Sequence, residues 1–137
     1  FKNIFDYKNK YFNFINLKDE FYLDTEYLEF YKKLQMITKN DNCIQNLNYD
    51  PTIYYLLKKP SCTKFYTTFI IATKDDQISF IEELKKSNID KLIIDTVNTD
   101  TIYNPNLRFK IISKYISLNY INHTNINDFK ILVKYND

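Results

Sequence analysis

The chain has 137 residues, of which 45% are hydrophobic, so it is long and apolar enough to bury a core as one domain. Its formal net charge is only +2 and its basic residues are scattered, which does not indicate a nucleic-acid-binding protein. It contains no glycine, which excludes the glycine-rich loops that cradle phosphate groups. We therefore expect Asn and Asp to occupy any left-handed turns.

Hydrophobic periodicity predicts three elements in the first half of the chain. Residues 1–21 are aromatic and poorly periodic, and they fit either an edge strand or a juxtamembrane connector. A helix is predicted over residues 25–38, where apolar side chains recur at helical spacing. Residues 43–49 alternate between apolar and polar, which is typical of a strand. A short helix should follow between Asp50, which can cap it, and Pro60.

The second half predicts two further helices and two strands. Thr73 can cap a helix whose buried face is expected to comprise Ile78, Ile81 and Leu84. Residues 91–95 form a short apolar run, typical of a central parallel strand. A helix is predicted over residues 104–120. Residues 129–135 are predicted to form a strand, which could lie at the edge of the sheet because its lysines would hinder pairing with the strand of another molecule.

Alternating strands and helices predict a single soluble α/β domain spanning residues 1–137. We expect a three-layer sandwich with a mainly parallel sheet of about four or five strands. Because a loop makes the last connection, the final strand could be antiparallel.

The two cysteines, Cys43 and Cys62, allow two interpretations. They could form a disulfide in an oxidising compartment, or they could be separate buried thiols. With a single histidine, His123, no metal site is expected. The carboxylate pairs of the chain are better explained by helix capping and by a solvated helix face than by catalysis.

Two sets of residues are candidates for ligand binding. Asp50 and Asp95 each follow a predicted strand, so they should lie at the same sheet edge, where open α/β sheets bind ligands. A helix cap and a solvated loop explain them equally simply. The second set combines cations with aromatic rings that could hold a sugar or a lipid-linked phosphate, or could pack a short helix against the sheet. It comprises Lys58, Lys59 and Lys64 with Tyr54, Tyr55, Phe65 and Tyr66.

The same region carries a family resemblance. Residues 54–66 read YYLLKKPSCTKFY, a Tyr-rich helix followed by a Pro-Ser-Cys-Thr turn and an aromatic pair. Further matching pieces are Ala72–Gln77, Phe80–Lys85, Lys91–Ile94, Arg108, Tyr115-Ile116 and Asn119-Tyr120. In this order they resemble the C-terminal extramembrane region of bacterial polytopic glycosyltransferases, which are similar to dolichyl-phosphate-mannose protein mannosyltransferases. The resemblance covers roughly residues 43–120, and Lys64 departs from it because the family often has Arg there.

The resemblance implies a function for the domain. In such enzymes the catalytic acid lies in an extracytoplasmic loop near the first membrane spans, so no catalytic residue and no cofactor are expected in this domain. The implied partners are the membrane-embedded part of the same chain and a lipid-linked sugar or glycan acceptor, on the periplasmic or outer face of the membrane. The domain would bind the acceptor or frame the active site.

Other readings of the chain make different predictions. The first residue is Phe1 rather than Met, so we expect a piece of a longer protein, yet no apolar run approaches the roughly 18 residues of a membrane span. The alternative is a freestanding α/β binding or interaction module of unknown ligand. A small hydrolase would need Asp50, Asp95 and His123 in one pocket.

Overall fold

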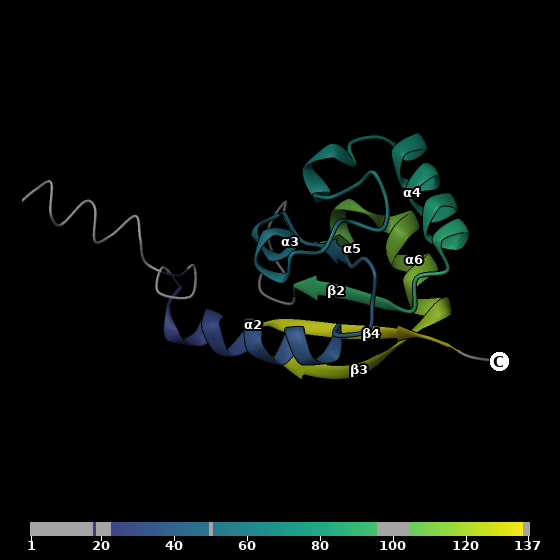
Figure 1. Ribbon diagram of the computed structural model, residues 1–137. Coiled ribbons are helices and arrows are strands. Elements are labelled where there is room, and N and C mark those ends of the chain that lie inside the picture. The colour runs from purple at the N-terminus through teal and green to yellow at the C-terminus, as the bar shows by residue number, and fades with distance from the viewer. Residues whose placement is uncertain (1–17, 19–22, 50, 96–104, 136–137) are drawn as a thin grey trace, which may run out of the picture.

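The computed structural model describes residues 18, 23–49, 51–95 and 105–135. Helices and strands alternate along this part of the chain (Figure 1). The elements are α2 (Thr25–Ile37), β1 (Gln45–Leu47), α3 (Thr52–Leu57), the 3-10 helix η2 (Thr68–Ile70), α4 (Lys74–Ser87), β2 (Lys91–Asp95), α5 (Pro105–Arg108), α6 (Lys110–Asn119), β3 (Tyr120–Ile126) and β4 (Phe129–Lys134). The expected α/β class is therefore confirmed. The expected strand or connector over residues 1–21 lies outside the described residues, apart from Lys18.

The starts of the long helices are fixed by local side-chain caps. The Asp24 carboxylate accepts a hydrogen bond of 2.7 Å from the Tyr27 N–H at the start of α2. At α4, Thr73 and Asp76 form a capping box, in which each side chain accepts from the other residue's backbone N–H. These bonds satisfy N–H groups that have no partner inside the helix, which is why both predicted starts are confirmed.

The sheet is mixed, with strand order β1-β2-β4-β3. β1 runs parallel to β2, whereas β4 is antiparallel to both β2 and β3. The expectation of a mainly parallel sheet is therefore wrong for the described strands, although the final strand is antiparallel as anticipated. The expected edge position of that strand is also wrong, because β4 lies between β2 and β3.

The strand β3 was not predicted, and its presence makes β4 an inner strand and adds a second antiparallel pair to the sheet. Its Asn-rich sequence has low strand propensity, so it was expected to be a loop. It nevertheless pairs with β4 from Tyr120↔Lys134 to Ile126↔Phe129. Asn127 takes a left-handed conformation with φ of 50° at the tight connection, which a hairpin of this kind needs. A two-residue connection can join only antiparallel neighbours, so the β3–β4 pair is antiparallel like the β2–β4 pair.

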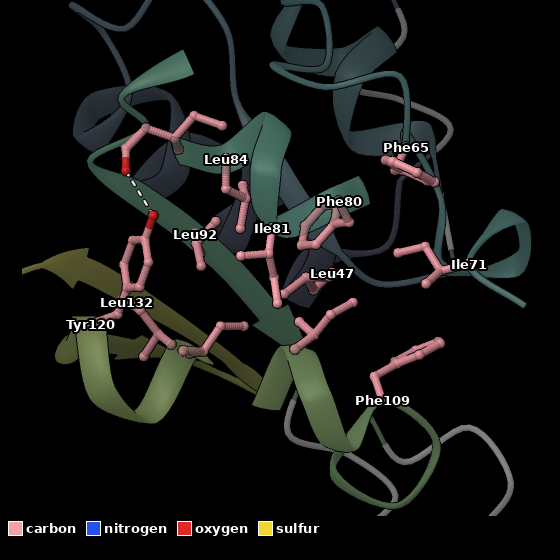
Figure 2. Packing of buried hydrophobic residues seen from close by; sticks show 13 residues of the cluster. Leu47, Phe65, Ile71, Phe80, Ile81, Leu84, Leu92, Phe109, Tyr120 and Leu132 are labelled. Carbon is pink, nitrogen blue, oxygen red and sulfur yellow. Dashed lines mark hydrogen bonds between the residues drawn. The ribbon is translucent and has the colours of Figure 1, made fainter. Parts of the chain in front are cut away.

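Two hydrophobic clusters cover the two faces of the sheet. On one face, α4 and α6 pack against Leu47, Leu92 and Leu132, as Figure 2 shows. On the other face, α2 and α3 pack against alternate strand residues, including Ile93 and Ile131. Because neighbouring residues of a strand point to opposite faces, the apolar run of β2 serves both clusters.

The helix predicted over residues 104–120 is divided in the described structure. Phe109 separates α5 from α6 and has a non-helical backbone (φ −115°, ψ 57°). Its ring is buried in the α4–α6 cluster, and the neighbouring Ile111 N–H donates to the Gln77 side chain at 3.2 Å. Burying the ring compensates for the loss of helical hydrogen bonds at this position.

No helix among the described residues is both long enough and apolar enough to cross a bilayer.

Candidate functional site

The segment that carries the family resemblance is closed by a disulfide. Cys43 and Cys62 are bonded, with their Cα atoms 5.0 Å apart. Beside them the backbone forms a parallel bridge, in which the Ile44 N–H donates to Pro60 O at 3.1 Å and the Cys62 N–H donates to Ile44 O at 2.9 Å. The disulfide, rather than separate thiols, therefore fixes the turn after α3 to the start of β1.

A buried glutamine organises the same turn. Gln45 has no exposed surface, and its Oε1 accepts from the hydroxyls of Thr63 at 2.9 Å and Ser61 at 3.3 Å. Its Nε2 donates to Phe65 O at 2.9 Å. A buried amide is costly unless it is hydrogen-bonded, so this network holds the turn in one conformation. The hydroxyls of the Pro-Ser-Cys-Thr motif thus point inward, toward β1.

Tyr54 also has an internal role. Its hydroxyl oxygen accepts a bond of 3.0 Å from the Asn46 N–H, and its ring packs against the α2–α3 cluster. Burial raises the pKa of the Tyr54 phenol, and a hydrogen bond with Ser61 partly offsets that effect. Tyr54 therefore connects α3 to β1, and it is not displayed on the surface as a sugar-stacking ring would be.

The three lysines of the predicted binding set separate in space. The ammonium group of Lys59 donates to Thr38 O at 2.7 Å and also to Asp41 O, at the end of α2. Lys64 instead forms an ion pair of 3.1 Å with Glu83 of α4, on the other face of the sheet. Lys58 follows α3 and is exposed. These cations do not gather around one ligand position.

The remaining predicted ligand residues are also dispersed. Tyr55 is 67% exposed on α3, and Tyr66 is 51% exposed after the turn. Asp95 ends β2, where its backbone pairs with Phe129, but its side chain lies outside the described residues, as does the whole of Asp50. His123 is exposed on β3, two strands away from β2. Ligand binding by the predicted residues stays a prediction.

An exposed apolar surface, which we call the edge patch, lies just beyond the carboxyl end of β1. It consists of Tyr49, Tyr66, Phe69 and Ile70, each at least 40% exposed. The rings of Tyr49 and Phe69 are 6.0 Å apart. The Thr67 hydroxyl donates to Tyr49 O at 2.9 Å, and the Thr68 N–H donates to Asn48 O at 3.2 Å. These bonds hold the two segments of the edge patch side by side.

A second surface feature is a cleft of about 440 Å³ beside α2 and α3, which we call the basic cleft. Its lining residues are Lys18, Leu23, Tyr31, Lys32, Gln35, Leu56 and Lys58. Of these seven residues, all from the described part of the chain, three are lysines and none is acidic. The sequence did not predict this site because its residues come from three separate segments of the chain. Of these residues, only Lys58 belonged to a set predicted to bind a ligand.

Two other hollows are less suggestive. One of about 320 Å³ lies at the amino ends of β1 and β2, beside the disulfide, where Lys91 and Asp41 form an ion pair of 2.7 Å. This ion pair occupies two of the three charged side chains in its lining, and the third is Asp90. The other is an open apolar groove between α4 and α6, lined in part by Ile78, Tyr115 and Leu118.

Comparisons of the chain with protein-family models, with curated proteins and with solved structures find no match. The resemblance to polytopic glycosyltransferases therefore rests on the quoted residues alone. Those residues are largely occupied in building the fold, through the disulfide, the Gln45 network and the Tyr54 contact.

Proposed function

We propose that this chain is a non-catalytic extracytoplasmic domain of a membrane-bound glycosyltransferase, in which it binds the acceptor or frames the active site. The observation that carries the proposal is the Cys43–Cys62 disulfide, which lies inside the segment that resembles the family. Structural disulfides persist in oxidising compartments, which supports a position on the outer face of the membrane.

The internal role of the resembling segment supports the same proposal. Ser61 and Thr63 are bound to Gln45, and Tyr54 is bound to Asn46. A sequence motif whose side chains stabilise the fold, rather than bind substrate, is expected in a non-catalytic domain when the reaction takes place in another part of the same chain. The reacting groups would then belong to the membrane-embedded part.

We further propose that the edge patch faces that membrane-embedded part. Tyrosine and phenylalanine side chains are enriched where a protein meets the membrane interface, because they combine an apolar ring with, in tyrosine, a polar tip. In Figure 1, α2 begins on the side toward which β2 points, and β1 runs parallel to β2. Tyr49 of the edge patch, which closely follows β1, therefore lies toward the end of the sheet at which α2 begins.

The test is to express the complete native reading frame and to label its cysteines with a membrane-impermeant maleimide. We expect Cys43 and Cys62 to resist labelling until a reductant is added and then to react from the outer side of the membrane. The complete protein should transfer sugar from a polyprenyl-phosphate donor, whereas the 137-residue chain alone should not. Replacing Tyr49 and Phe69 with serine should lower transfer by the complete protein, while the exposed control Met36→Ser should not.

The alternative is a freestanding α/β binding or interaction module. The observation in its favour is that helices cover both faces of the sheet, so each hydrophobic cluster is complete within the described residues. A native reading frame without membrane spans, with reduced cysteines and no transferase activity, would favour this alternative over the proposal.

A further inference from the structure

The lysines of the basic cleft converge without a partner for their charge. Lys32 belongs to α2, Lys58 follows α3, and Lys18 precedes α2. Within the described part of the chain, none of their ammonium groups forms an ion pair or a hydrogen bond. Lys59 and Lys64 are different, because each is bound to specific oxygen atoms.

The acidic residue of α2 nearest to Lys32 in the sequence does not neutralise the charge of the basic cleft. Glu29 lies one turn before Lys32, at a spacing that permits a helical ion pair, yet the two side chains do not form one. Gln35 lies one turn after Lys32 and lines the same cleft. Its amide and the Tyr31 hydroxyl are neutral hydrogen-bonding groups beside the cations. This combination suits a ligand with negative charge and several acceptor oxygens.

The backbone at Lys58 ends α3 in a left-handed conformation, as is common at helix C-caps. Lys58 has a φ of 53°, in the left-handed region that disfavours residues other than Gly and Asn. The other described residues with positive φ are Asn88 and Asn127, as expected for a chain without glycine. Lysine at this position costs conformational energy, which is offset by the capping bonds from the Lys58 and Lys59 N–H groups to Tyr55 O and Tyr54 O. Lys58 lies at the end of α3 and lines the basic cleft.

We propose that the basic cleft binds a phosphate-bearing anion, either a free phosphate compound or the headgroup of a lipid. Lysine is a compact point charge and a common phosphate ligand, and several lysines suit a ligand with more than one negative charge. This inference does not depend on the proposed glycosyltransferase function, because it rests only on the residues of the basic cleft.

The test uses the 137-residue chain and two probes. Inorganic pyrophosphate is titrated while backbone amide shifts are recorded, and co-sedimentation is measured with vesicles of phosphatidylglycerol and of phosphatidylcholine alone. Each of the variants Lys32→Gln and Lys58→Asn should weaken binding roughly five-fold, as expected for the loss of one favourable cationic contact. Lys86→Gln, which removes the same charge from α4, is the matched control and should leave binding unchanged.

Lys58→Asn separates binding from folding. Asparagine tolerates the left-handed conformation better than lysine, so this variant should raise the melting temperature while it weakens binding. Binding to pyrophosphate identifies a free phosphate ligand, and binding to phosphatidylglycerol vesicles alone identifies a headgroup; both support the proposal. Failure to bind either probe, or equal weakening by Lys86→Gln, would overturn it.

Discussion

Removing the disulfide between Cys43 and Cys62 should lower the free energy of unfolding by about 3 kcal/mol. The bond joins residues with a sequence separation of 19, and the loop-entropy relation gives this value for a loop of that length. For a domain of this size, such a change corresponds to a fall of about 10 °C in melting temperature. Because the chain contains only two cysteines, a reductant acts on this bond alone.

Urea unfolding followed by circular dichroism, with and without dithiothreitol, measures the effect. The double variant Cys43→Ser with Cys62→Ser should match the reduced protein. Releasing the loop should also increase the dependence of the unfolding free energy on urea, because the unfolded chain exposes more surface. A loss of less than about 1 kcal/mol would refute the loop-entropy reasoning, which assigns the stabilisation to the lower entropy of the cross-linked unfolded chain.

Two further predictions concern stability. Gln45→Ala should lower the unfolding free energy by about 2–4 kcal/mol in chemical denaturation, because it leaves the Thr63 hydroxyl and Phe65 O without their buried partner; the exposed control Gln35→Ala should change it by less than about 0.5 kcal/mol. Hydrogen bonds from Thr73 hold the pKa of Asp76 below its ordinary value. The stabilisation by Asp76 is therefore complete above the ordinary aspartate pKa of about 3.9 and is lost as the pH falls through the lowered pKa. Thermal melts of Asp76→Asn across this range should show a weaker dependence on pH than the unmodified protein, and an identical dependence would contradict the assignment.

The sequence predicted those features that depend on near neighbours. Asp24 and Thr73 cap helices through residues within one turn, so the starts of α2 and α4 were predictable from local chemistry. The strand at residues 91–95 was predicted with the bounds it has, because an apolar run flanked by polar residues needs burial on both faces. The presence of a disulfide was left open, since two cysteines alone do not establish pairing.

The candidate sites were less predictable, because they depend on which side chains point the same way. Lys58, Lys59 and Lys64 are near neighbours in the sequence, but they face different parts of the molecule. Lys58 and Lys32 are distant in the sequence, yet they line the same basic cleft. The left-handed conformation of Lys58 was also unexpected, because the sequence favoured Asn for such positions.

By itself, the sequence determined the α/β class and the starts of α2 and α4, which follow from periodicity and from contacts within a few residues. The buried helix faces were predicted only in part, because Ile81 and Leu84 are buried whereas Ile78 is 39% exposed. Only the tertiary structure decided that the Asn-rich segment forms β3, that β4 is an inner strand, and that the sheet is mixed. The tertiary structure also decided which lysines are bound to oxygen atoms of the protein and which line the basic cleft. Strand order and surface clusters join residues that are far apart in the chain, and their free energy depends on burial and charge that exist only after the layers have packed.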